Sequence, residues 1–253
     1  MNKINSKVAV VSGATSGIGF EIVKQFLNQK IHTIAIGRRC ERLKELEEEY
    51  GSLITIVKAD ISQRNILKKQ LKNLPIPFQT PDYLINAAGL SLGFDEFADA
   101  QDEDWEVMVN TNIIGVLNLT SYFLPKIKER GTGHIINIGS IAAFYPYLKS
   151  NVYSGTKAFI HNFTLNLKSE FTGTNVKVTC LSPGMVKTEF ALVRFKGDYE
   201  KANSFYKNYN VLTPKDIANT VMFCISQPEH VNITSMEIMS VDQPFHLGLG
   251  RKD

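Results

Sequence analysis

A tyrosine and a lysine stand four residues apart in the segment Y-S-G-T-K, as Tyr153 and Lys157. Residues i and i+4 share one face of a helix, so the phenol and the ammonium can act at one site. A phenol has an ordinary pKa of about 10 and is a weak acid at neutral pH, but a positive charge beside it favours the phenolate. Tyr153 is therefore suited to take a proton from an alcohol, or to return one to a carbonyl oxygen.

A serine completes this set. Ser140 precedes Tyr153 by thirteen residues and ends a predicted strand. Open parallel sheets hold their ligands at the carboxyl ends of strands. A hydroxyl in that place can donate a hydrogen bond to the substrate oxygen whose proton Tyr153 exchanges.

A glycine-rich turn, S-G-A-T-S-G-I-G, follows the first apolar run and precedes a predicted helix. Phosphate binding needs residues without Cβ where the backbone approaches a pyrophosphate, and a helix N-terminus behind them. The spacing is G-x-x-x-G-x-G rather than the commoner G-x-G-x-x-G. We expect this turn to hold the phosphates of a dinucleotide through Gly13, Ala14, Thr15, Ser16, Gly17, Ile18 and Gly19.

The end of the second predicted strand reads Ile36-Gly37-Arg38-Arg39, without a carboxylate. An acidic side chain there would accept the adenosine ribose hydroxyls and repel a 2′-phosphate. Guanidinium groups match phosphate in charge and in bidentate geometry. Arg38 and Arg39 therefore predict NADP as the cofactor. The alternative is that they are surface arginines at the start of a helix.

Short apolar runs alternate with helix-length segments along the chain. The runs are largely apolar rather than alternating, as in strands buried on both faces of a parallel sheet. The predicted strands are 8–13, 32–37, 54–59, 83–88, 134–139, 176–182 and 235–241. The predicted helices are 18–30, 39–50, 62–73, 102–129, 153–171 and 214–227. This order predicts an α/β fold, a Rossmann-like doubly wound parallel sheet of about seven strands with helices on both faces.

The interval 188–212 contains no predicted strand and is rich in aromatic residues. Connections of this length are uncommon in compact domains unless they form a lid or a binding loop. We expect a substrate lid or loop here, and an oligomer contact is the alternative. Thr213-Pro214 then offers an N-cap and a first-turn proline to the next helix.

The chain has 253 residues, 43% of them hydrophobic and 21% charged, and no linker-like composition divides it. We expect residues 1–253 to form a single domain. Three unpatterned cysteines indicate buried or free thiols in a reducing compartment. The five histidines show no metal-ligand spacing. No uninterrupted apolar run approaches the roughly 18 residues of a membrane span, and the net charge of +3 is spread along the chain. We predict a cytoplasmic protein without metal, membrane or nucleic acid.

The glycine turn and the Ser140, Tyr153 and Lys157 set resemble the short-chain dehydrogenase/reductase family, and the resemblance covers nearly the whole chain. It implies a catalytic role for Asn112 in the segment N-x-x-G. In the family the matching asparagine holds a helix irregularity and a water that relays protons to the lysine. Asn110 lies two residues earlier and lacks a glycine three residues on.

The resemblance also implies further cofactor contacts beyond the glycine turn. Asn86 stands in N-A-A-G, where Ala87 replaces the second asparagine of the family pattern. The remaining contacts belong to an adenine-side pair and a nicotinamide-side segment, and they are Asp60, Ile61, Pro183, Gly184, Val186 and Thr188.

Several segments are similar to one branch of that family, the NADP-dependent 3-hydroxy acid dehydrogenases. They are I-G-R-R-C-E-R-L, G-H-I-I-N-I-G-S, N-V-Y-S-G-T-K-A-F and T-E-F-A-L-V-R-F-K-G-D. The similarity implies a small substrate of the serine, allo-threonine or 3-hydroxypropionate type. The enzyme would oxidise its β-hydroxyl, or form it by the reverse reduction. The similarity also implies a homotetramer. A substrate carboxylate needs a cation, and Arg194 in the predicted lid is the candidate. A surface or interface arginine is the alternative.

Two other functions stay open at this point. One is an NADPH-dependent short-chain reductase of another carbonyl, such as a 3-oxoacyl thioester, a diketone or a pterin side chain. The other is a regulatory protein that senses NADP without turnover, which the presence of both Tyr153 and Lys157 disfavours. The same residues serve oxidation and reduction, so the sequence does not give the direction.

Overall fold

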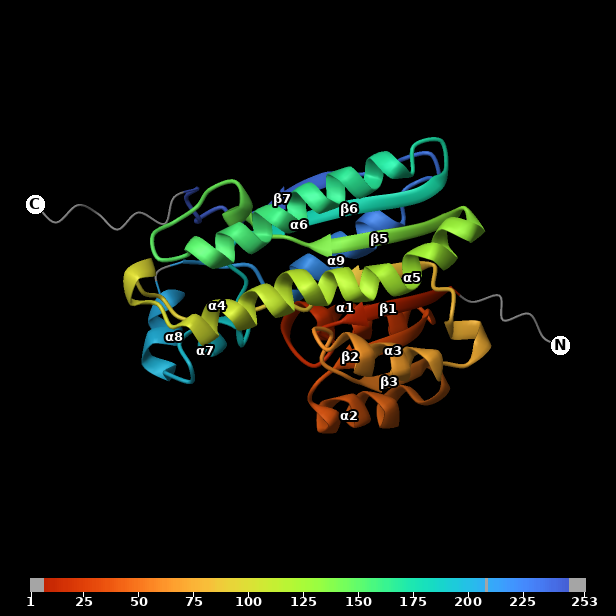
Figure 1. Ribbon diagram of the computed structural model, residues 1–253, viewed down its shortest axis with the longest axis horizontal. Coiled ribbons are helices and arrows are strands. Elements are labelled where there is room, and N and C mark those ends of the chain that lie inside the picture. Colours follow the sequence, from red (N-terminus) through yellow and green to blue (C-terminus); the bar gives the residue numbers. More distant parts are fainter. Residues whose placement is uncertain (1–6, 208, 246–253) are drawn as a thin grey trace, which may run out of the picture.

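The computed structural model describes residues 7–207 and 209–245. Its centre is a seven-stranded sheet in the order β3-β2-β1-β4-β5-β6-β7, with every neighbouring pair parallel (Figure 1). The strands are β1 (Val8–Ser12), β2 (His32–Gly37), β3 (Ile54–Lys58), β4 (Tyr83–Asn86), β5 (Thr132–Ile138), β6 (Asn175–Pro183) and β7 (Ser235–Ile238). The predicted doubly wound parallel sheet is confirmed.

Helices cover both faces of the sheet, as the alternation of apolar runs predicts (Figure 1). One face carries α1 (Gly17–Asn28), α2 (Cys40–Tyr50) and α9 (Pro214–Ile225). The other carries α3 (Arg64–Lys72), α5 (Val116–Arg130) and α6 (Asn151–Glu170). Each layer buries large side chains against the strands, with Phe26 on the first face and Phe123 on the second fully buried. This removal of apolar surface from water is the main stabilising term of the fold.

The long helix predicted over 102–129 is interrupted. Its first part, α4 (Asp102–Val109), passes into a π-helical turn, Asn110–Gly115, before α5 continues. Such single turns of π-helix are frequent at functional sites. The whole stretch Asp102–Arg130 is long and apolar enough to cross a membrane by length and composition, but 44% of its most apolar window is buried inside the protein. Within this stretch, Leu119, Phe123 and Ile127 are fully buried in the core beside the sheet.

Two short helices lie in the predicted lid, where the sequence indicates none. They are α7 (Phe190–Arg194) and α8 (Tyr199–Phe205), each too short for an apolar periodicity to emerge. A bridge between Val186 and Leu212 closes the base of the segment. The predicted start of α9 is confirmed, because Thr213 and Asp216 form a capping box at its first turn.

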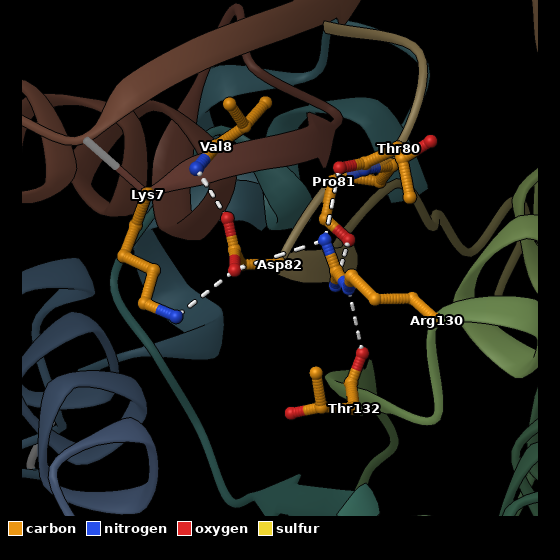
Figure 2. Close-up of polar contacts among 7 residues, drawn as sticks. All are labelled: Lys7, Val8, Thr80, Pro81, Asp82, Arg130 and Thr132. Carbon is orange, nitrogen blue, oxygen red and sulfur yellow. Dashed lines mark hydrogen bonds and ion pairs between the residues drawn. The ribbon is translucent and has the colours of Figure 1, made fainter. Parts of the chain in front are cut away.

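A polar cluster ties together the amino ends of β1, β4 and β5 (Figure 2). The carboxylate of Asp82 accepts hydrogen bonds from the Val8 amide at 2.8 Å and from Lys7 Nζ at 3.0 Å. The Arg130 guanidinium donates to three main-chain carbonyls, those of Thr80 (3.0 Å), Pro81 (2.7 Å) and Thr132 (3.0 Å). Arg130 therefore joins the last turn of α5 to the segments that enter β4 and β5.

Replacing Arg130 with Met removes these three bonds and should lower the free energy of unfolding by about 1–3 kcal/mol. Chemical denaturation followed by circular dichroism measures the change. Lys128 is the matched control, because it lies exposed in the same last turn of α5 and has no ion pair in the described part of the chain. Equal losses in Arg130→Met and Lys128→Met would mean that only helix-end charge is involved.

Candidate active site

Helices α7 and α8 lie beyond the carboxyl ends of the central strands (Figure 1). Adjoining cavities at these strand ends form a groove. The strand order reverses between β1 and β4, and such a switch point is where open parallel sheets bind ligands. Three cavities follow the groove: one beside Tyr153, one along the glycine turn and one at the end of β2. Gly89 borders all three, so the cavities adjoin.

The structure brings Ser140, Tyr153 and Lys157 together around the first cavity, as predicted. Tyr153 and Lys157 lie one turn apart on α6, and each side chain is buried. Lys157 Nζ lies 5.9 Å from the centre of the Tyr153 ring and donates a hydrogen bond to the Ile138 carbonyl at 2.9 Å. Ser140 follows β5, and its Oγ accepts a hydrogen bond from the Ala142 amide at 3.1 Å. The end of β5 and helix α6 therefore hold all three side chains on one side of the first cavity.

Burial is the largest cause of the pKa shifts of Tyr153 and Lys157. It raises the pKa of the Tyr153 phenol, while the Ser140 hydroxyl and the charge of Arg194 act to lower that pKa. Burial also lowers the pKa of Lys157 to about 8. The spacing of Tyr153 and Lys157 indicates lysine as the cation that favours the phenolate. In the structure, the cation that acts to lower the pKa of Tyr153 is Arg194, from the predicted lid.

Asn112 lies in the π-helical turn, so the helix irregularity that the family resemblance implies is confirmed. Its Nδ2 donates to the Leu90 carbonyl at 2.8 Å and to Thr156 Oγ1 at 3.0 Å, and its Oδ1 accepts from the Leu90 amide at 2.9 Å. These bonds fasten the loop after β4 to α6. A Cβ on Gly89 would lie 3.3 Å from Lys157 Nζ and 3.4 Å from Asn112 Oδ1. The glycine leaves the space between these two polar atoms open.

The glycine turn has the shape that a dinucleotide phosphate needs. Gly13 has a φ of +71°, and a Cβ there would lie 2.9 Å from the backbone of Ala88. Gly17 has a φ of +52° and faces the side chain of Thr188 across the groove. Side chains at these positions would be strained and would fill the groove, so the bare backbone is what lets a phosphate approach.

Most of the predicted cofactor residues line the groove. These are Gly13, Thr15, Ser16, Gly17, Ile18, Gly19, Arg38, Arg39, Asp60, Ile61, Pro183, Gly184, Val186 and Thr188. Ala14 and Asn86 do not line it. Ala14 is fully buried in the core beneath the turn. Asn86 Nδ2 donates to Thr120 Oγ1 at 3.1 Å and to Asn137 Oδ1 at 2.7 Å, inside the protein.

The two arginines after β2 have different surroundings. Arg38 is exposed, and its contact with Asp60 is long, 3.8 Å. Arg39 is held by Thr15, whose carbonyl accepts from its Nη2 at 2.9 Å, and by Glu189, whose carboxylate lies 2.6 Å from its Nη1. Of the pair, Arg38 is the one whose guanidinium is free to turn toward a phosphate, and Arg39 joins the glycine turn to the lid.

Arg194 is the largest fully buried side chain of the described residues, 1% exposed, and it lines the cavity that holds Ser140 and Tyr153. Its Nη2 donates to the Tyr147 hydroxyl at 2.6 Å. Its Nε and Nη1 have no hydrogen-bond partner in the part of the chain described here. Five aromatic rings surround the guanidinium at 5.0–5.8 Å, those of Phe94, Tyr147, Tyr153, Phe190 and Phe205.

Sequence reasoning does not find three residues of this site. Tyr147 holds Arg194, Glu189 holds Arg39, and Gln243 Oε1 accepts a hydrogen bond from the Met185 amide at 2.7 Å beside the same cavity. None of them belongs to a motif with an apparent chemical reason, and their partners come from distant segments. The described residues contain no cluster of His, Cys, Asp or Glu that could hold a metal.

The chain matches the short chain dehydrogenase family over residues 7–197 and belongs to it. Among its relatives, serine 3-dehydrogenase of Rhizobium radiobacter is 45% identical over 240 residues, which cover 95% of this chain and 96% of that protein. NADP-dependent 3-hydroxy acid dehydrogenase YdfG of Escherichia coli (strain K12) is 44% identical over 239 residues, with 94% of this chain and 96% of that protein covered. The family predicted from the motifs is confirmed.

Two solved structures are similar to this chain. The closed form of serine dehydrogenase complexed with NADP⁺ has a TM-score of 0.93 and 44% identity, covering 97% of this chain and 99% of that one. Serine dehydrogenase from Escherichia coli has a TM-score of 0.83 and 39% identity, covering 94% of this chain and 99% of that one.

The lowered pKa of Lys157 predicts how stability depends on pH. Between about 8 and the ordinary value of 10.5, the unfolded chain binds more protons at this lysine than the folded protein does. Raising the pH across that window therefore stabilises the wild type, and a Lys157→Met variant lacks this term. We expect the stability of Lys157→Met relative to wild type to be greatest below pH 8 and to decline as the pH rises.

Denaturation midpoints measured at several pH values between about 7 and 10 test this expectation. Lys69→Met is the control, because Lys69 lies exposed on α3 and its removal should leave the pH profile parallel to wild type. A profile of Lys157→Met that also runs parallel to wild type would contradict the burial argument.

Proposed function

We propose that this protein is an NADP-dependent dehydrogenase that oxidises the β-hydroxyl of small 3-hydroxy acids of the serine, allo-threonine or 3-hydroxypropionate type, or reduces the matching semialdehyde or keto acid. The observation that carries the substrate class is Arg194. The Arg194 guanidinium is buried in the same cavity as Tyr153 and Ser140, and two of its nitrogens have no partner among residues 7–207 and 209–245. Such a group is suited to bind a carboxylate beside the reacting carbon. The similarity to the serine and 3-hydroxy acid dehydrogenases supports the same class.

The groove offers NADP a place along its whole length. The glycine turn and Thr188 would hold the pyrophosphate, Asp60 and Ile61 the adenine side, Arg38 with Arg39 the 2′-phosphate, and Pro183, Gly184 and Val186 the nicotinamide side. When bound, NADP supplies the acceptor or donor of the hydride. Asn86 would act indirectly, because its bonds to Thr120 and Asn137 hold the strand ends from which the loop of Ala87 to Gly89 departs.

The proton chemistry falls to the groups around the first cavity. Ser140 donates a hydrogen bond to the substrate oxygen, and the Tyr153 phenolate takes the hydroxyl proton during oxidation. In the reverse direction the phenol returns that proton to the carbonyl oxygen. Lys157, with a pKa of about 8, can exchange protons near neutral pH, and Asn112 borders the open space beside its Nζ. The family resemblance implies a water molecule held by Asn112 that would relay protons to Lys157.

We further propose a single domain with 188–212 as a substrate lid, acting in the cytoplasm as a homotetramer without metal, membrane or nucleic-acid partners. The tetramer comes from the family resemblance. The lid is supported by Phe190, Arg194 and Phe205, which reach the cavity of Tyr153 from this segment. A small net charge and a core packed on both faces of the sheet accord with a soluble protein.

The function is tested by NADP⁺-coupled oxidation of serine, allo-threonine, 3-hydroxypropionate and 3-hydroxyisobutyrate, with diketones and 3-oxoacyl thioesters as NADPH-coupled alternatives. We expect turnover of the hydroxy acids and a loss of at least about 100-fold in kcat for Tyr153→Phe, because the phenol is the proton donor and acceptor. The variant should still bind NADPH, measured by calorimetry. An active Tyr153→Phe enzyme, or turnover restricted to uncharged carbonyls, would contradict the proposal.

Replacing Arg194 with Met tests the carboxylate site. Loss of a buried charge partner should lower kcat/KM for 3-hydroxy acids by at least about 30-fold, while the methyl esters of the same acids should change by less than about threefold. Lys201→Met, which removes an exposed lid cation on α8, is the control. An equal loss on acids and esters would show that Arg194 shapes the cavity without binding the carboxylate.

A further inference from the structure

Glu189 links the lid to the cofactor end of the groove. It stands between Thr188 and the first residue of α7, and its two carboxylate oxygens contact two different arginines. Oε2 lies 2.6 Å from Arg39 Nη1, and Oε1 lies 3.0 Å from Arg42 Nη2. Arg42 belongs to the first turn of α2, so the contact joins segments about 150 residues apart in the chain.

The two arginines are themselves fastened to the glycine turn. The Thr15 carbonyl accepts from Arg39 Nη2 at 2.9 Å and from Arg42 Nη1 at 3.3 Å. Thr15 and Glu189 border the same cavity at the end of β2, and Glu189 also borders the cavity along the glycine turn. The chain of contacts from Thr15 through the arginines to Glu189 therefore spans the cofactor groove from the glycine turn to the lid.

The same short helix carries the proposed substrate cation. Helix α7 runs from Phe190 to Arg194, and the Val193 amide donates to the Glu189 carbonyl at 2.9 Å. Arg194 thus lies a little over one helical turn from Glu189. Its own carbonyl accepts from the Gly93 amide at 3.0 Å. Glu189 and Arg194 therefore lie at the two ends of one short helical segment.

We propose that Glu189 is a positioning residue that holds α7 across the cofactor groove through Arg39 and Arg42 and thereby places Arg194 in the substrate cavity. The inference rests on the proposed function for the role of Arg194. On this proposal Arg39 connects the NADP site to the substrate site, because the same arginine lies beside the 2′-phosphate site and holds the lid. Glu189 and the 2′-phosphate must then contact Arg39 at the same time rather than compete for it.

The solvent exposure of Glu189, Arg39 and Arg42 sets how much the loss of their ion pairs should change lid opening. The three side chains are 37–45% exposed, and ion pairs of this kind are individually weak. Two pairs that share one carboxylate hold a helix too short to be stable alone. Their loss should therefore produce several-fold changes in lid opening and in substrate affinity, and the enzyme should remain folded and active.

Hydrogen–deuterium exchange on the cofactor-free enzyme tests the contact without substrate or turnover. In Glu189→Gln we expect amides within 190–197 to exchange about three- to tenfold faster, with amides of α9 unchanged. Glu200→Gln is the control, because Glu200 is an exposed glutamate on α8 with no ion pair in the described residues. Unchanged exchange in 190–197, or faster exchange throughout the protein, would overturn the proposal.

Kinetics test the consequence for Arg194. In Glu189→Gln, KM for a 3-hydroxy acid should rise about three- to tenfold with kcat within about twofold, and KM for its methyl ester should not change. Arg42→Gln should give a similar rise, and Glu189→Gln with Arg42→Gln together should give no more than the larger single effect, because both remove one network. Additive effects, or equal changes for acid and ester, would overturn the positioning role.

One further outcome would also overturn it: tighter NADPH binding in Glu189→Gln with NADH binding unchanged, because that result would mean that the carboxylate competes with the 2′-phosphate. Failure of the proposed function is distinguishable from failure of this proposal. A wild-type enzyme that oxidises no hydroxy acid contradicts the function and the role of Arg194, whereas the exchange experiment still decides whether Glu189 holds the lid.

Discussion

Burying a guanidinium away from water is costly unless hydrogen bonds and an opposite charge compensate, and Arg194 is buried with only one of its three nitrogens bonded in the described structure. Aromatic faces offset part of that cost, since rings attract a cation that has lost its water. An anion that enters the cavity would offset more. The aromatic cage and the proposed substrate class both follow from this constraint, because the surrounding rings reduce the cost of burying the charge and a bound carboxylate would reduce it further.

The proposed catalytic residues are held by a different part of the fold. Lys157 and Tyr153 are held by α6, Ser140 by the end of β5, and Asn112 by a π-helical turn that bonds to the loop after β4. All four lie at the carboxyl ends of strands, where a parallel sheet leaves its loops free for binding. Burial raises the pKa of the phenol, which the charge of Arg194 acts to lower, and burial lowers the pKa of the lysine to about 8.

Much of this could be read from local patterns. The apolar runs give the strands because both faces of the sheet are buried, and the spacing of Tyr153 and Lys157 places them on one helix face. Helices α7 and α8 escaped prediction because five and seven residues carry too little periodicity. The sequence predicts the same role for both arginines after β2. The structure distinguishes them, because Arg39 forms an ion pair with Glu189, which is far along the chain. The role of Ala14 likewise depends on which way its side chain faces, and it faces the core.

The sequence by itself determined the family, and it predicts the cofactor turn and the residues of the proposed proton chemistry, because these depend on short-range spacing within strands, turns and helices. Only the tertiary structure decided what surrounds Arg194 and what holds the lid. Its cage draws on Phe94, Tyr147, Tyr153 and Phe205, and its helix is fastened through Glu189 to Arg39 and Arg42. Those contacts join segments that no local pattern relates, since burial and charge pairing act between whichever residues the fold brings within reach.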